Sequence, residues 1–122
     1  MHTVVALALP DAIAFDLATA VETFGRVTLP DGRPAYRVIV AGTAPTVDAG
    51  PLQIATGVGL EALERADTII VPGRNDSAAP VPDGVAEALR AAAAAGTRIA
   101  SICVGAFVLA EAGLLDGQLA TT

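Results

Sequence analysis

The sequence predicts an α/β fold, a three-layer sandwich in which a mostly parallel sheet lies between helices on both of its faces. Short, continuous apolar runs bounded by turn residues are typical of strands that are covered on both faces. Such runs alternate with helical patterns along the chain. The chain has 122 residues, 53% of them hydrophobic, which is enough for one domain with its own core but not for two.

The first half of the chain opens with an apolar strand at residues 3–9. We expect Asp16 to cap the helix that follows, whose apolar side chains recur along one side from Leu17 to Phe24. A loop rich in Pro, Asp and Gly separates this helix from a second strand at residues 36–41. This order of strand, helix and strand is the repeating unit of a parallel sheet.

The remaining elements continue the same alternation. We expect Asp83 to cap a helix that ends at Gly96, because glycine suits the residue after a helix. Right-handed crossovers bring the carboxyl ends of all parallel strands to one edge of the sheet, where ligands bind in such folds. The predicted elements of this part are a hairpin or arm at 47–55, a short helix at 60–65, strands at 68–71 and 97–102, and helices at 83–96 and 104–115.

Composition and charge exclude several classes of function. The net charge is -6 and all seven basic residues are Arg, which argues against nucleic-acid binding by this part of a protein. The absence of Lys excludes a Schiff-base lysine and a P-loop, and we expect neither a cofactor nor a metal. A single Cys fits a reducing compartment, and the apolar N-terminal run is too short to cross a membrane, so we expect a cytoplasmic protein.

The segment around Cys103 carries the most information about chemistry. A predicted buried strand runs directly into Cys103, which is followed by the small residues Gly105 and Ala106 and by an apolar helix. This is the pattern of a nucleophile elbow, a sharp turn that presents one side chain at the sheet edge. The helix start would favour a thiolate, and the Val104 N–H could bind an anion. The alternative is that Cys103 is simply a small buried hydrophobic residue.

Three segments of the sequence resemble the ThiJ/PfpI superfamily, which belongs to the class I glutamine-amidotransferase-like folds. Residues 102–117, ICVGAFVLAEAGLLDG, resemble its cysteine elbow, and residues 15–24, FDLATAVETF, resemble its first-helix motif. Residues 69–73, IIVPG, resemble its central strand and the glycine beside the cysteine. The segments occur in the order of the family and span essentially the whole chain, and they are most similar to the N-terminal sensor domain of AraC-type transcriptional regulators.

The resemblance implies a flavodoxin-like sandwich in which the candidate site residues meet at one sheet edge. Cys103 and Asp16 would be the catalytic pair if the site is active, because an Asp in the matching motif of isonitrile hydratases assists the cysteine. The simpler role for Asp16 is the N-cap of its helix. The candidate ligand-binding residues are Gly73, Arg74, Val104 and Gly105.

The sequence also departs from the family pattern. The peptidase-like branch usually has His directly after the cysteine, where this chain has Val104, and the only histidine is His2. A Cys–His pair is therefore not expected, and amidase or protease chemistry lacks its base. Thr19-Ala20 replaces a Gly-Pro, and Arg74 replaces a second glycine after Gly73. We expect Arg74, like Asp76, to be a solvent-exposed loop charge unless it contacts a ligand.

Three functions from different classes follow from the resemblance. The first is a ligand-sensing domain of an AraC-family regulator, which binds a small-molecule effector, dimerises, and contacts DNA only through a C-terminal helix-turn-helix domain that is not in this chain. The second is a small cysteine enzyme of the isonitrile hydratase type, and a stress-response member without catalysis is a third alternative.

Family members continue with a further strand and helix after residue 122, so we expect residues 1–122 to be a domain truncated at its C-terminal end. Such a truncation would leave an exposed apolar edge of the sheet, which favours a homodimer.

Overall fold

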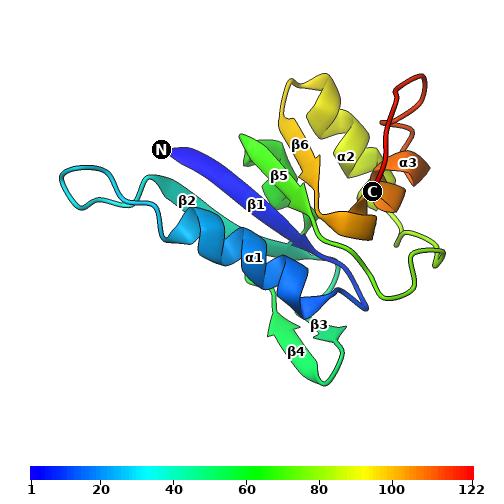
Figure 1. The fold of residues 1–122 in the computed structure, drawn as a ribbon, viewed down its shortest axis with the longest axis horizontal. Helices are drawn as coiled ribbons and strands as arrows, with labels where there is room; N and C mark the ends of the chain where they lie inside the picture. The colour runs from blue at the N-terminus through cyan, green and yellow to red at the C-terminus, as the bar shows by residue number, and fades with distance from the viewer.

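The structure, a computed structural model, describes all residues from 1 to 122 and contains two sheets (Figure 1). The larger sheet is parallel throughout and has the strand order β2-β1-β5-β6. Its strands are β1 (His2–Ala8), β2 (Tyr36–Gly42), β5 (Thr68–Val71) and β6 (Arg98–Ser101). The predicted arm is a separate antiparallel hairpin of β3 (Thr46–Ala49) and β4 (Leu52–Ala55), and in Figure 1 it projects from the end of the sheet.

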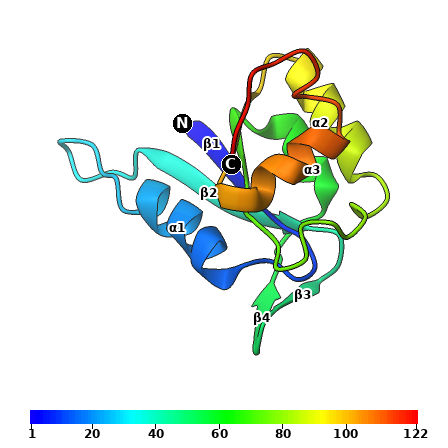
Figure 2. The same cartoon turned by 45° about the vertical axis from the view of Figure 1, so that its right-hand side comes forward.

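Helices cover both faces of the parallel sheet, as Figures 1 and 2 show. Helix α1 packs on one face, and the 3₁₀ helix η1, α2 and α3 pack on the other. The predicted α/β sandwich with a mostly parallel sheet is therefore confirmed. The bounds are α1 (Ala14–Gly25), η1 (Leu60–Arg65), α2 (Val85–Ala94), the 3₁₀ turn η2 (Cys103–Gly105) and α3 (Ala106–Glu111).

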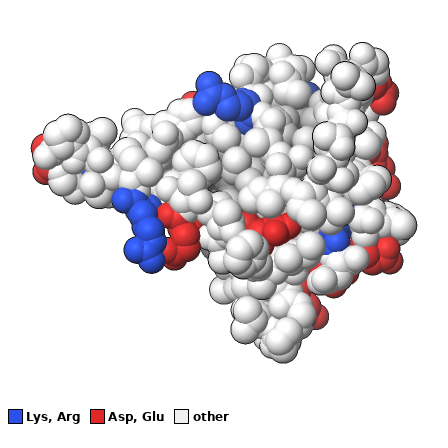
Figure 3. Space-filling model, in the orientation of Figure 1, with Lys and Arg blue, Asp and Glu red and all other residues white.

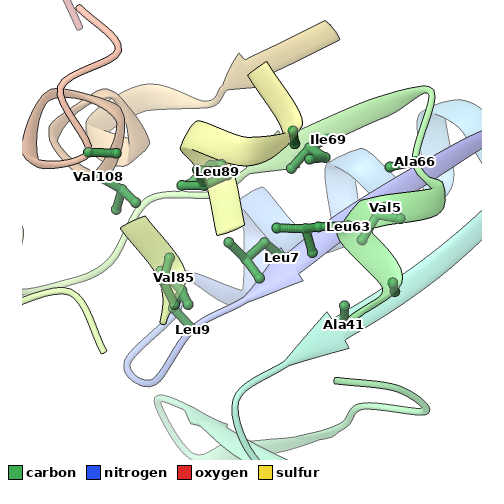
Figure 4. Packing of buried hydrophobic residues seen from close by; sticks show 14 of the residues in the cluster. Val5, Leu7, Leu9, Ala41, Leu63, Ala66, Ile69, Val85, Leu89 and Val108 are labelled. Carbon is green, nitrogen blue, oxygen red and sulfur yellow. The ribbon is translucent and has the colours of Figure 1, made fainter. Parts of the chain in front are cut away.

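The centre of the sheet explains the apolar run near the N-terminus. Residues Val4 to Ala8 of β1 have no exposed surface, because this strand is covered on both faces. Alternate side chains divide between two cores: Val5 and Leu7 face η1 and α2, as Figure 4 shows, and Val4, Ala6 and Ala8 face α1. A side chain of this size contributes about 1.5–3 kcal/mol when fully buried, so this strand anchors the fold.

Three details of the predicted helices are wrong. Helix α1 begins at Ala14 with Ile13 at its N-cap, so Asp16 lies inside the first turn and does not cap the helix. Helix α2 has Gly84 at its N-cap, in a left-handed conformation (φ 84°), and Asp83 provides no side-chain cap. The helix expected at 104–115 is shorter, because α3 ends at Glu111.

Glycines close α2 and α3 in the same way. Gly96 (φ 89°) follows α2 as predicted, with Gly96 N–H bonded to Ala93 and Thr97 N–H bonded to Ala92. Gly113 (φ 81°) repeats this arrangement after α3, where Leu114 N–H bonds to the Leu109 carbonyl. Both are Schellman motifs, which satisfy the last carbonyls of a helix and stop it. The apolar side chains beyond Gly113 therefore suggested a longer helix than the backbone forms.

Candidate functional site

The candidate site lies where the strand order of the parallel sheet reverses. From β1 the chain moves to β2 on one side, and the later strands β5 and β6 lie on the other side. The connections that leave the carboxyl ends of the neighbouring strands β1 and β5 therefore run to opposite sides of the sheet. This is a switch point, which is where open α/β sheets usually bind ligands. Helix α1 follows β1, Gly73 follows β5, and Cys103 follows β6 at this edge.

Cys103 occupies a strained turn at the end of β6. Its φ is 52°, in the left-handed region that side chains other than glycine rarely adopt. Ile102 N–H bonds to the Val71 carbonyl at 3.0 Å, and Gly105 N–H bonds back to the Ile102 carbonyl at 2.9 Å, so the turn is fixed at both ends. Cys103 is exposed, which excludes the interpretation of this residue as a small buried hydrophobe. Strain of this kind is typical of functional positions.

Gly105 makes the sharp turn possible because it has no Cβ. A Cβ at this position would overlap the backbone carbonyl oxygen of Val71 and lie 3.0 Å from the Pro72 carbonyl group. The φ of Gly105 is −58°, so the glycine is required for space and not for its conformational freedom. This contact places the elbow directly against the end of β5.

Asp16, Gly73 and Val104 meet beside the elbow. Asp16 is only 7% exposed, and its Oδ2 accepts a hydrogen bond from the Gly73 N–H at 3.2 Å. A Cβ on Gly73 would lie 2.8 Å from Val104 Cγ2 and 2.9 Å from Asp16 Oδ2. Gly73 therefore lets the side chains of two different elements approach each other. No hydrogen bond joins the Cys103 thiol to Asp16, and the approach of the elbow to Asp16 runs through Val104 and Gly73.

Arg74 differs from the sequence prediction. It is 5% exposed and is not a solvent-facing charge. Its guanidinium folds back on the loop of residues 74–82, donating hydrogen bonds to the carbonyls of Ala79 (2.8 Å) and Pro80 (3.2 Å). Arg74 is buried because the loop closes around its side chain and supplies carbonyl acceptors that the sequence does not reveal. Asp76, in contrast, is exposed as expected.

Two acidic residues that the sequence analysis did not single out hold this loop in place. Asp11, with a φ of 64°, accepts hydrogen bonds from Asn75 Nδ2 (3.1 Å) and from the Asp76 N–H (2.9 Å). Glu111, the last residue of α3, accepts one from the Val81 N–H at 2.8 Å. The Pro10-Asp11 pair was the available signal, since Asp tolerates left-handed turns and bonds nearby amides. The 74–82 loop thus connects the start of α1 to the end of α3.

His2 lies at the amino-terminal ends of the parallel strands, whereas Cys103 lies at their carboxyl ends. Its Nε2 is 2.8 Å from the hydroxyl of Thr68, the first residue of β5, and its ring packs edge-on against Tyr36. All strands of this sheet are parallel, so the first residues of β1 and β5 are a strand length away from the elbow. Histidine therefore cannot act as a base for Cys103 within this chain.

The surface around Cys103 is open. Five hollows of the structure, bounded by residues of other elements or by the far side of α3, are not lined by Cys103. One of about 400 Å³ lies beyond β2, bounded by Gly42, Thr56 and Gly59, and another of about 380 Å³ lies between η1 and α2. No group of three or more His, Cys, Asp or Glu side chains is suited to hold a metal ion. No helix has the length and apolar character needed to cross a membrane.

Comparison with known proteins identifies related sequences and folds. The sequence model of the DJ-1/PfpI family matches residues 11–122. An uncharacterised protein from the cpoL 5′ region of Streptomyces lividans is 30% identical over 122 residues, which cover 99% of this chain and 86% of the relative. Oxidised DJ-1 of Toxoplasma gondii has the same fold, with a TM-score of 0.74 and 24% identity over 96% of this chain and 64% of its own.

A regulator has the same fold too. The AraC family transcriptional regulator from Pseudomonas putida matches with a TM-score of 0.73 and 21% identity, over 97% of this chain and 64% of its own. The chain thus spans less than two thirds of the length of these two solved structures.

Proposed function

The chain belongs to the DJ-1/PfpI family, and we propose that within this family it is the ligand-sensing domain of an AraC-type transcriptional regulator. The observation that carries the proposal is the elbow itself: an exposed Cys103 on a strained turn, beside the buried carboxylate of Asp16, at an edge without histidine. This geometry suits the binding of a small molecule better than nucleophilic turnover. The fold shared with the Pseudomonas putida regulator is compatible with such a role.

The absence of a histidine base favours binding over amidase or peptidase chemistry. A cysteine nucleophile in those reactions is activated by a base within hydrogen-bond reach, usually histidine. His2 is bonded to Thr68 at the far edge of the sheet. The proposed ligand contacts are Asp16, Gly73 and the Val104 and Gly105 segment of the elbow, with Cys103 at the mouth of the site.

The charge distribution supports a division of labour between sensing and DNA binding. The net charge of -6 would repel DNA phosphates. Figure 3 shows that Arg side chains lie at separate points on the visible face and form no continuous basic surface there. In this proposal DNA is therefore contacted by a helix-turn-helix domain outside these 122 residues, and the protein acts in the cytoplasm.

A homodimer is part of the proposal because two large apolar side chains close in sequence to the site residues are exposed. Phe15, next to Asp16 on α1, is 79% exposed, and Phe107, on α3 just after the elbow, is 48% exposed. Strand β6 is an edge strand with alternating exposed residues. A contiguous surface formed by such residues would mark an interface. A second copy would enclose the effector site, and it would also present two DNA-binding domains to two half-sites.

One observation favours a second candidate, a cysteine enzyme of the isonitrile hydratase type. Asp16 is a buried carboxylate at the edge that carries Cys103, and only one of its oxygens has a partner, the Gly73 N–H. A carboxylate in such a place can act as a proton donor or acceptor. In this alternative the Cys103 sulfur adds to the isonitrile carbon while Asp16 transfers the thiol proton to the substrate, and water then displaces the thiol to give the formamide.

The test compares the two candidates on the natural full-length protein. DNA binding is measured with DNA from upstream of its own gene, and hydration of a simple alkyl isonitrile is measured on the same sample. Cys103→Ser and Asp16→Asn serve as site variants, and the exposed Arg98→Gln serves as a matched surface control. Specific DNA binding without isonitrile hydration supports the sensor. Isonitrile hydration that is lost in Cys103→Ser, without DNA binding, assigns the protein to the enzyme class.

A further inference from the structure

The only buried cation of the chain has no anionic partner. Arg74 is 5% exposed, yet it takes part in none of the three ion pairs, which belong to Arg26, Arg33 and Arg90 on the surface. Its hydrogen bonds go to the uncharged carbonyls of Ala79 and Pro80. A charge that is removed from water is costly unless an opposite charge compensates it.

The acidic residues around the 74–82 loop do not supply that charge. Asp11 is bonded to Asn75 and Asp76, and Asp76 Oδ1 accepts a hydrogen bond from the Ala78 N–H at 3.0 Å. Glu111 accepts one from the Val81 N–H. Each carboxylate thus holds backbone or amide donors of this loop, and none forms an ion pair with Arg74. The carboxylates around the loop are numerous enough to neutralise the guanidinium, but the fold directs them to backbone and amide N–H groups instead.

Arg74 retains hydrogen-bond donors that the chain does not use. A guanidinium has five N–H groups, and the loop uses one on each terminal nitrogen. The Nε–H donates no hydrogen bond within the chain. Because no fully buried side-chain nitrogen of the protein lacks a partner, Nε is not sealed from solvent. A small molecule that reaches this point finds a desolvated positive charge with unused donors.

We propose that Arg74 is a specificity-determining residue that binds an oxyanion group, a carboxylate or a phosphate, of the small-molecule effector. The inference rests on the proposed sensing function, because Arg74 directly follows Gly73, whose N–H holds Asp16 at the candidate site. A guanidinium in a partly desolvated setting is the side chain best suited to oxyanions. A side chain that only held the 74–82 loop together would need hydrogen-bond donors but no charge. The binding of an anionic ligand would explain why this position carries a buried charge.

The experiment measures thermal unfolding of the 122-residue chain with acetate, inorganic phosphate or the neutral analogue acetamide, at constant ionic strength. A saturable rise in Tm is expected with at least one of the two anions and not with acetamide, because ligands that bind only the folded state raise its stability. The anion that acts distinguishes a carboxylate from a phosphate effector. Arg74→Gln, which keeps an amide donor but loses the charge, should abolish the rise, and Arg74→Lys should retain part of it. The exposed Arg98→Gln is the control and should respond as the wild type does.

A second measurement keeps the test decisive if Arg74→Gln does not fold. In the wild-type protein, the Arg74 Nε–H resonance in a nitrogen–proton NMR spectrum should shift saturably with the anion, while that of Arg98 should not. Equal Tm responses in wild type and Arg74→Gln, or anions that act no differently from acetamide, would overturn the proposal. Anion binding at Arg74 in a protein that never binds DNA would leave this inference standing and remove only the regulator function.

Discussion

Replacing Gly105 with alanine tests whether the elbow depends on the close approach of two backbones. The added Cβ would overlap the Val71 carbonyl oxygen and meet the Pro72 carbonyl at 3.0 Å, and neither group can rotate away because both belong to the main chain at the end of β5. Overpacking a well-filled site costs about 1–3 kcal/mol, and a main-chain obstacle places this variant near the upper end, at about 3 kcal/mol.

This cost converts into a large change in melting temperature. Unfolding entropy is about 2.1 cal/mol/K per residue, so a chain of 122 residues gains roughly 0.26 kcal/mol/K on unfolding. A loss of about 3 kcal/mol then lowers Tm by about 12 °C. The Cys103 thiol should also react with iodoacetamide at a changed rate, because the turn that presents it must shift.

The assay is differential scanning calorimetry of Gly105→Ala, with Gly25→Ala as the matched control. Gly25 ends α1, and apart from its chain neighbours and its own helix backbone no heavy atom lies within 4 Å of the position where its Cβ would be. Alanine is the better helix former by up to about 1 kcal/mol, so the control should melt at or slightly above the wild-type temperature. A Gly105→Ala protein that melts within about 2 °C of the wild type would refute the reasoning.

Three further predictions concern the carboxylates and the thiol. Asp16→Ala should lower the urea midpoint, because it leaves the Gly73 N–H without its acceptor, at a cost of about 1–3 kcal/mol. Asp16→Asn keeps an oxygen at this place and should lose little stability. Equal losses of stability in the two variants would contradict this. The backbone N–H groups of Glu61 and Gly59 donate hydrogen bonds to the Glu61 carboxylate, which lowers the pKa of this group from its usual value of 4.5. The ionised Glu61 therefore stabilises the fold above pH 4.5, and this contribution is lost as the pH falls through the lowered pKa. Acid titration of Glu61→Gln should therefore show a shallower loss of stability than the wild type, and an unchanged slope would count against the pKa shift. Glutamine and peptide substrates should not be turned over, and an activity that disappears in Cys103→Ser would prove this wrong.

The strands could be predicted from the sequence because their signal is local. The run at residues 68–71 coincides with β5, and the run at 3–9 overlaps β1 (His2–Ala8) to within a residue at each end. A strand that is buried on both faces must be apolar at every position, so composition alone marks it. Gly96 could be placed for a similar reason, since the residue after a helix needs a positive φ that glycine adopts without strain.

The polar residues of the site could be listed from the sequence but not given partners. The sequence predicts either an N-cap or a partner of Cys103 for Asp16, whereas its acceptor oxygen serves the Gly73 N–H, 57 residues further along the chain. Arg74 is expected in solvent unless it contacts a ligand, but the 74–82 loop encloses it. A polar side chain satisfies its hydrogen bonds with whatever the fold brings near, and that neighbour is set by the crossing of separate elements. Hydrophobic periodicity carries no information about it.

The left-handed backbone of Cys103 has a consequence for anyone who engineers this protein. A residue with a Cβ at φ 52° carries strain of order 1–3 kcal/mol, which glycine would relieve. Position 103 is therefore a place where the fold by itself would prefer glycine to cysteine. A campaign that selects variants for heat resistance alone would tend to discard the thiol early. Thermostable descendants of this chain should be sequenced at position 103 before their response to a ligand is compared with that of the parent.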